Sequence, residues 1–304
     1  MGEEGLKVHS ERDVPFFYGF LKISIILMAV TIKDIIKCLD EIAPFAIAES
    51  WDNVGLLVGN RDREVRSILV GLDPTTRLLD EAVTVGADTV ITHHPAIFKP
   101  IPSIDTGEPA GKFLEKALNN HINVFACHTN FDSVAPGVND ELADLLGLEN
   151  ISPLIPGASQ PFNGAGMGRL GHYRQPLDRT TFINKVLDIL ELPSIQTAGS
   201  LPEMISCVAL CGGSGSEFAE VARNCGADLF ITSEIKHNIA RWAEEANFCV
   251  IDGTHYATEK PALKLLVKKI KTYMDTRNWN ISISETTTER HPLKLVDKNS
   301  YIKT

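Results

Sequence analysis

The stretch GADTVIT at residues 86–92 recurs later in the chain as GADLFIT at residues 226–232. In both copies a helical pattern leads into a glycine-containing turn, and an apolar run that ends in threonine follows the turn. A further apolar run precedes each helical pattern, at 67–72 and at 207–210. Strands that are apolar throughout and alternate with helices favour parallel pairing and right-handed crossovers. The repeat therefore predicts an α/β fold built from two similar halves that are related by internal pseudo-symmetry.

The chain of 304 residues is long enough for two such halves. Another apolar strand pattern follows each copy, at 123–126 and at 248–252, and each runs into a loop that carries histidine. Glycine and proline are concentrated at 153–171, which is typical of a connecting segment. We therefore expect the first half to span residues 28–160 and the second half to span residues 161–304.

Residues 1–27 precede the first regular pattern and are expected to be a tail or a misassigned start. The helical spacing of apolar residues begins only after Thr31. An apolar run at 16–32 is interrupted by Lys22, and it has neither the basic start nor the cleavage site of a secretory signal. Its length is also marginal for a membrane span. These features predict a soluble, cytoplasmic protein that does not bind in a membrane.

The formal net charge is −10, from 29 Lys and Arg residues against 39 Asp and Glu residues. An acidic chain repels phosphate backbones, so nucleic-acid binding would need a local basic patch. The densest basic cluster has the helical spacing of a solvated face and comprises Lys264, Lys268, Lys269 and Lys271. The six cysteines include no CxxC motif, and several lie in apolar runs. This usage predicts reduced core thiols rather than a cysteine-zinc site.

Side chains that can bind metal follow the predicted strands of the first half. His93 and His94 come directly after the strand that ends at Ile91, and Asp132 follows the strand at 123–126. Open α/β sheets bind ligands outside the carboxyl ends of their strands. Adjacent residues of an extended chain point in different directions, so the two histidines are suited to two neighbouring ions. The first half thus supplies three predicted metal ligands.

The second half supplies His255 and Glu259, which follow the strand that ends at Asp252. A helix predicted after Thr254 places these two side chains on one face, because they are four residues apart. A carboxylate in this position can bridge two ions that lie about 3.5–4 Å apart. Each residue alone is more often a structural group, but together the five predict two divalent metal ions in the cleft between the halves. Histidine and carboxylate ligands suit Zn, Mn, Fe and Co alike.

Six ordered motifs lie between about Thr31 and the end of the chain. They are WDNVG at 51–55, ITHHP at 91–95, HTNFD at 128–132, GRLG at 168–171, CGGSG at 211–215 and GTHYATE at 253–259. In these motifs the chain resembles the Nif-three-like family, whose members are often labelled GTP cyclohydrolase 1 type 2 homologues. The resemblance implies a dinuclear site at His93, His94, Asp132, His255 and Glu259, with Glu259 bridging. It also implies two α/β halves that assemble as a toroidal homohexamer.

Two features depart from the family pattern. Many members have Gly-Asp before a His-His pair, where this chain has Ser233-Glu234 and then His237-Asn238. His237 is therefore a candidate acid–base or outer group, but it lacks the second histidine. The chain also lacks the extra domain that some members insert between the halves, so functions of that insert do not carry over.

Three further groups leave alternatives open. His128 is either a proton shuttle that titrates near neutral pH or a loop residue fixed by a hydrogen bond. The glycine-rich segment 211–215 lies between a predicted strand and a predicted helix, so its amides either cradle a phosphate or form a tight turn. Trp51 favours a place in the core, and Asp52 and Asn53 favour a role in a turn.

The leading hypothesis for function is a metal-dependent hydrolase with His237 or His128 as catalytic residues, because metals lower the pKa of bound water to about 7. The resemblance implies a nucleotide substrate whose purine ring is opened, and hydrolysis of a phosphoester suits two ions equally well. The alternative is a non-catalytic protein that handles or senses metal, whose coordination positions would be closed. A protein-interaction scaffold is a third hypothesis. We expect a small-molecule partner rather than a nucleic acid.

Overall fold

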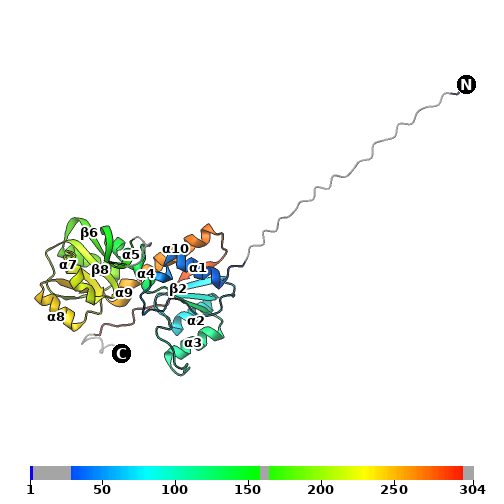
Figure 1. The fold of residues 1–304 in the computed structure, drawn as a ribbon, viewed down its shortest axis with the longest axis horizontal. Coiled ribbons are helices and arrows are strands. Elements are labelled where there is room, and N and C mark those ends of the chain that lie inside the picture. Colours follow the sequence, from blue (N-terminus) through cyan, green and yellow to red (C-terminus); the bar gives the residue numbers. More distant parts are fainter. Residues whose placement is uncertain (3–28, 158–163, 297–304) are drawn as a thin grey trace.

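The computed structural model describes residues 1–2, 29–157 and 164–296, and it contains two β-sheets with helices packed on both faces of each sheet (Figure 1). The expected α/β class is therefore confirmed. The expected tail at 1–27 falls almost wholly outside the described residues. Within the described ranges, no helix has the length and apolar character needed to cross a membrane.

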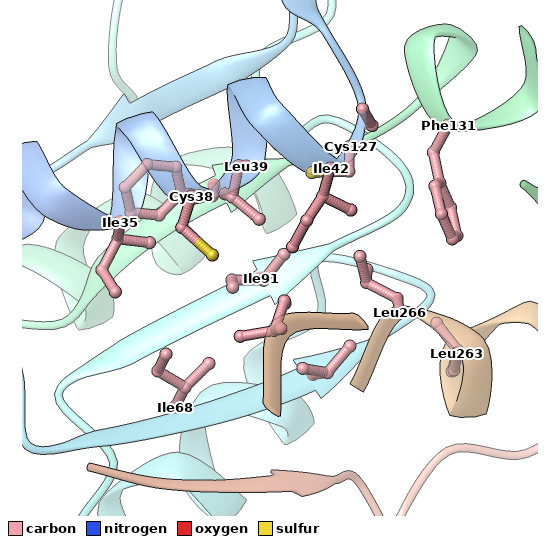
Figure 2. Close-up of a cluster of buried hydrophobic side chains, with 14 of the residues drawn as sticks. Ile35, Cys38, Leu39, Ile42, Ile68, Ile91, Cys127, Phe131, Leu263 and Leu266 are labelled. Carbon is pink, nitrogen blue, oxygen red and sulfur yellow. The ribbon is translucent and has the colours of Figure 1, made fainter. Parts of the chain in front are cut away.

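The first sheet has the strand order β1-β4-β3-β2-β11, in which only β1 is antiparallel to its neighbour. Its strands are β1 (Gly55–Val58), β2 (Ser67–Gly71), β3 (Thr89–Thr92), β4 (Asn123–Ala126) and β11 (Ser282–Glu285). Alternate residues of a strand point to opposite faces. Ile68 of β2 therefore packs under two helices, α1 (Ile32–Ile42) and α10 (Ala262–Thr276), as Figure 2 shows. Leu69 faces α2 (Thr76–Val85) and α3 (Pro109–Asn119) on the other side.

The second sheet has the strand order β5-β6-β8-β9-β10-β7, and β8, β9 and β10 are parallel. Its strands are β5 (Glu149–Pro156), β6 (Gly166–Asp178), β7 (Gln196–Ala198), β8 (Met204–Ser214), β9 (Leu229–Ser233) and β10 (Cys249–Asp252). Leu210 and Ile231 pack against α5 (Val138–Leu146) and α6 (Arg179–Leu190). Phe230 faces α7 (Ala219–Asn224) and α8 (His237–Glu245) on the opposite side. Four shorter helices complete the described fold: η1 (Phe45–Ile47), α4 (Thr129–Ser133), η2 (Ser216–Phe218) and α9 (His255–Glu259).

The repeated GAD turns have the same local structure in both sheets. Gly86 and Gly226 have φ angles of 71° and 84°, which glycine adopts without the steric cost of a Cβ atom. The Asp88 N–H donates to the carbonyl of Ser67, and the Asp228 N–H donates to that of Cys207. Both trios, β2-β3-β4 and β8-β9-β10, also have an antiparallel strand beside their third member. The repeat in the sequence thus corresponds to a shared strand order.

The expected boundary at residue 160 does not match the sheets. Strand β5 lies before that boundary but belongs to the second sheet, whereas α10 and β11 lie after it but belong to the first. The physical reason is the apolar stripe of α10, in which Leu263, Leu266 and Ile270 complete the same core as α1. The chain therefore returns to the first sheet after α9, and β11 covers the edge of β2 that would otherwise be unpaired.

A buried ion pair joins β6 to α5. Arg169 is 1% exposed, and its Nε and Nη2 donate to the two carboxylate oxygens of Asp140 at 2.7 Å each. Nη1 donates to the carbonyls of Gly166 and Gly168, and Nη2 also donates to that of Val134. The guanidinium is therefore fully engaged, as a buried charge must be.

Candidate metal centre

The hydrogen bonding of the first sheet holds His93 and His94 at the end of β3. The His93 N–H donates to the carbonyl of Gly71 at 3.2 Å, and the His94 N–H donates to that of Leu72 at 3.0 Å. These bonds continue the parallel pairing of β3 with β2. Asp132 lies in α4, directly after the neighbouring strand β4. The three side chains therefore gather at the carboxyl edge of the sheet, where the strand pattern places them.

Helix α9 brings His255 and Glu259 to the same place from the second sheet. This helix starts directly after Thr254, so His255 and Glu259 lie one turn apart on one face. The Glu259 carboxylate reaches both groups of histidines. Its Oε1 lies 3.1 Å from His255 Nε2 and 3.7 Å from His93 Nε2, and its Oε2 lies 3.2 Å from His94 Nε2.

The five side chains form two overlapping groups that could each hold a metal ion. One group comprises His94, His255 and Glu259, and the other comprises His93, Asp132 and Glu259. His93 Nε2 lies 3.6 Å from Asp132 Oδ1, and the Nε2 atoms of His94 and His255 are 3.1 Å apart. Ligands about 2.0–2.1 Å from a tetrahedral ion lie about 3.3 Å from one another. The observed separations therefore fit metal coordination.

Each of the three histidines is held through Nδ1, which leaves Nε2 facing the cluster. His93 Nδ1 donates to the carbonyl of Cys127 at 2.8 Å. His94 Nδ1 donates to Asp73 Oδ1 at 2.8 Å, and His255 Nδ1 donates to Glu234 Oε1 at 3.0 Å. Metal-binding histidines characteristically donate their other ring N–H to a carboxylate or a carbonyl. The converging Nε2 atoms therefore have the arrangement of ligands.

The most buried ligand atoms have no hydrogen-bond partner among the described residues. These atoms are His93 Nε2, Asp132 Oδ1 and Glu259 Oε2, in side chains whose residues are 2%, 7% and 4% exposed. Buried polar atoms are nearly always hydrogen-bonded, because an unpaired one costs about 1–3 kcal/mol. Metal ions held by the two candidate groups would satisfy these three atoms. The residues present therefore fit a metal on both geometry and chemistry.

The pKa values of the two buried carboxylates are shifted in opposite directions. Burial and the nearby Glu259 charge raise the pKa of Asp132 to about 7, against the opposing effect of His93. Burial also raises the pKa of Glu259, but His93, His255 and His94 outweigh it and hold this pKa well below its ordinary value. Glu259 is thus the carboxylate that stays ionised, as its position between the histidines requires.

Two residues that hold candidate ligands from outside the cluster were not predicted from the sequence. Asp73 orients His94, and Glu234 orients His255. A signal for Glu234 was present: in the alignment of GADTVIT with GADLFIT, Glu234 occupies the position of His94. The departure from the family pattern at Ser233-Glu234 therefore leaves a carboxylate beside the cluster. No comparable pattern pointed to Asp73.

The two histidines predicted as catalytic lie in different places. His128 lies beside the cluster, with ring centroids 5.2 Å from His93 and 5.4 Å from His94, and it forms a third candidate group with them. Its Nδ1 donates to Asp52 Oδ1 at 2.8 Å. Burial raises the pKa of Asp52, but hydrogen bonds from His128 and Thr129 outweigh it and hold that pKa well below its ordinary value. His237 is exposed at the start of α8, and in the described chain no hydrogen bond or ion pair links it to the cluster.

The glycine-rich segment 211–215 has a structural role. Its amide groups are already occupied: the Gly212 N–H donates to Asn139 Oδ1, the Gly213 N–H to Thr258 Oγ1, and the Gly215 N–H to Thr232 Oγ1. These bonds leave no set of free amides to cradle a phosphate. A Cβ atom at Gly213 would come within 2.1 Å of Glu259 Oε1. The glycine therefore makes room for the Glu259 carboxylate.

Gly213→Ala is expected to weaken metal binding by about tenfold or more, because the new methyl group displaces the Glu259 carboxylate. The φ of +66° at this residue adds backbone strain. Isothermal titration of the metal-free protein with Zn²⁺ measures the effect. Gly226→Ala is the matched control, since it also has positive φ but open space around its Cβ position. Equal loss of affinity in both variants would attribute the effect to backbone strain alone.

The sequence and the fold of the chain match those of known proteins. The sequence model of a family described as Duf34/NIF3 (NGG1p interacting factor 3) matches residues 30–292. A GTP cyclohydrolase 1 type 2 homolog of Clostridium acetobutylicum is 33% identical over 244 residues, which cover 80% of this chain and 91% of that protein. The solved structure of a hypothetical protein of Staphylococcus aureus, SA1388, matches with a TM-score of 0.82 at 30% identity, covering 88% of this chain and all of that one (100%).

Fold and site together define an α/β protein with a candidate metal centre formed where strands of two sheets end. The chain belongs to the Duf34/NIF3 family. A further relative, a GTP cyclohydrolase 1 type 2 homolog of Staphylococcus epidermidis, is 28% identical over an alignment of 341 residues that covers 78% of this chain and 93% of that protein. That alignment is longer than the 304 residues of this chain, as expected if the relative carries an insertion that is missing here.

Proposed function

We propose that this protein is a hydrolase of small molecules that depends on two divalent metal ions. One observation carries the proposal: the two candidate ligand groups overlap at Glu259, whose two oxygens face different histidines. A shared carboxylate of this kind is suited to a pair of ions rather than to one. When bound, such ions supply a Lewis acid and a water that is activated near neutral pH.

The exposure of the ligands supports catalysis over storage. His93, Asp132 and Glu259 are buried, whereas His94 and His255 are partly exposed. One side of the cluster is therefore open to solvent and to a small molecule. A site that only stores or stabilises would be closed by protein ligands. The five ligands, one of them shared, leave coordination positions for water and substrate.

His128 is the proposed proton-transfer residue, because it lies beside His93 and His94. The anionic Asp52 accepts its Nδ1–H and so fixes the orientation of the ring. The other ring nitrogen would take a proton from water or return one to the product. His237 belongs to none of the candidate metal groups among the described residues, so we do not propose it for this role.

For the substrate we propose a purine nucleotide whose ring is opened by hydrolysis. The support is the name GTP cyclohydrolase 1 type 2 homolog, which the relatives from Clostridium acetobutylicum and Staphylococcus epidermidis carry. A phosphoester remains the second candidate. The glycine-rich segment does not support phosphoester binding, because the amides of Gly212, Gly213 and Gly215 already donate to side chains.

Turnover of GTP and of a phosphoester panel by the metal-loaded protein tests the proposal. Ring opening is followed by the loss of purine absorbance, and phosphoester hydrolysis by the release of phosphate. We expect His128→Gln to lower kcat by about 100-fold without changing the metal content, because the proton-transfer group is lost. Metal bound with no turnover of any substrate would overturn the hydrolase and favour the metal-handling alternative.

We further propose that the two halves have a pseudo-twofold relation and that the protein assembles as a homohexamer in the cytoplasm. The shared strand order of the two trios supports the first part. The family resemblance supports the hexamer, and the six unpaired cysteines, five of them buried, suit a reducing compartment. The mass of the particle in solution, measured by light scattering, tests the assembly: a mass near that of one chain would refute it.

A further inference from the structure

The segment that follows β11 crosses from the first sheet to the start of α9 and contacts residues that adjoin the candidate metal centre on both sheets. We name residues 286–291 the C-terminal strap. They run from the first sheet, which contains β2, toward the second sheet, which contains β8 (Figure 1, red). The strap is anchored at its start by Glu81 of α2, which accepts hydrogen bonds from Thr286, Thr287 and Thr288. Burial raises the pKa of Glu81, but these bonds outweigh it and lower the pKa to about 2.

Glu289 of the strap forms a hydrogen bond with the backbone of Asp73, the residue that orients His94. Its Oε1 accepts the N–H groups of Leu72 and Asp73 at 2.9 and 2.8 Å, directly beyond the end of β2. The Asp73 carboxylate in turn accepts His94 Nδ1–H at 2.8 Å. The backbone that carries Asp73 is therefore fixed by the strap, and the His94 ring is fixed by Asp73.

His291 of the strap makes the matching contact in the second half. Its Nε2 lies 3.0 Å from Thr254 Oγ1, and its ring lies 5.4 Å from that of Tyr256. Thr254 directly precedes His255 and has a φ of 62°, which β-branched residues rarely adopt. Such a conformation costs about 1–3 kcal/mol and persists only where the surroundings enforce it. The contact with His291 is one of these constraints.

We propose that the C-terminal strap positions two ligands of one candidate metal group, with Glu289 acting on His94 through Asp73 and His291 acting on His255 through Thr254. These are positioning residues, because neither lies among the ligands. The proposal rests on the dinuclear centre proposed above. His94 and His255 belong to one candidate ligand group but come from different sheets. A segment that holds both therefore sets the distance between them.

The test measures Co²⁺ binding, because Co²⁺ reports its own coordination through its visible absorption. Glu289→Ala and His291→Ala are each expected to lower Co²⁺ affinity about tenfold or more and to alter the spectrum at saturation, as is typical when partners of metal ligands are removed. Thr254→Val removes the contact with His291 at its other end, and Asp73→Asn weakens the next link, from the Asp73 carboxylate to His94. They give the same expected result if either strap variant fails to fold.

Two controls separate positioning from a general loss of stability. Leu293→Ala changes an exposed residue just beyond the strap. Val186→Ala weakens the core of the second sheet without touching the strap. Both controls are expected to bind Co²⁺ with the affinity and spectrum of the wild type, even where the melting temperature falls. A double variant of Glu289→Ala with His291→Ala is expected to lose less affinity than the two single losses combined, because both changes release the same strap.

The outcomes distinguish the strap from the centre on which it acts. If the wild type binds Co²⁺ and both strap variants bind it with unchanged affinity and spectrum, the strap proposal is overturned and the metal centre stands. If the strap variants lose affinity only in proportion to their stability, as Val186→Ala would show, the strap is merely structural and the proposal also fails. If the wild type itself binds no Co²⁺, the dinuclear centre fails, and the strap proposal fails with it.

Discussion

Glu259→Gln is expected to leave the protein unable to hold either of the two proposed metal ions. Glu259 is the only residue shared by the two ligand groups, and its carboxylate lies within 3.1–3.7 Å of three histidine nitrogens. Glutamine keeps the volume but removes the negative charge and turns one oxygen into a donor that faces ligand nitrogens. The affinity should therefore fall by more than the roughly 10–100-fold typical for loss of an outer partner.

Variants that change only one of the two ligand groups test whether Glu259 serves both. Asp132→Asn affects only the group with His93, and His255→Ala affects only the group with His94. Each is expected to leave about one ion per chain, whereas Glu259→Gln leaves none. Elemental analysis after dialysis against Zn²⁺ gives the stoichiometry, and calorimetric titration gives the affinities. The same series measured with Mn²⁺ shows which ion the site prefers.

Glu217→Gln is the matched control, because it makes the same chemical change in an exposed residue paired with Lys236 on the surface. It should retain the full metal content. A Glu259→Gln variant that keeps both ions would refute the bridging role. Loss of one ion alone would show that the groups are separate sites rather than one shared centre.

The convergence of the candidate ligands could be predicted from the sequence because strand ends are local features. Continuous apolar runs mark β3, β4 and β10, and a parallel sheet brings the ends of such strands to one edge. His93, His94 and Asp132 follow from this rule alone. The i, i+4 spacing places His255 beside Glu259, although a five-residue helix such as α9 leaves little pattern of its own.

The supporting residues could not be predicted, because they depend on where distant segments pack. The contact of Glu289 with Leu72 joins residues that are 217 positions apart. It exists only because β11 returns to the first sheet, and β11, with the sequence Ser-Ile-Ser-Glu, lacks the continuous apolar run of a buried strand. The stripe of α10 likewise suits either sheet. Periodicity shows that a helix is buried, but it does not show against which partner.

Arg169→Met is expected to lower the free energy of unfolding by about 3–5 kcal/mol, the effect of removing one partner of a buried pair. Arg169 is 1% exposed, and the side chain of its partner Asp140 is 14% exposed. Methionine fills most of the volume but leaves the carboxylate without its bidentate partner. Equilibrium unfolding in urea measures the change. Arg179→Met is the matched control, because its ion pair with Glu203 is mostly exposed and should contribute about 0–1 kcal/mol.

A double variant, Arg169→Met with Asp140→Leu, separates the two roles of this arginine. Removing both charges should recover the part of the loss that comes from the unpaired carboxylate. The remainder should persist, because the carbonyls of Val134, Gly166 and Gly168 still lack their donor. Full recovery would show that these three hydrogen bonds contribute nothing. Val134 directly follows α4, which carries Asp132, so a persistent loss should be accompanied by weaker binding of the ion that Asp132 holds.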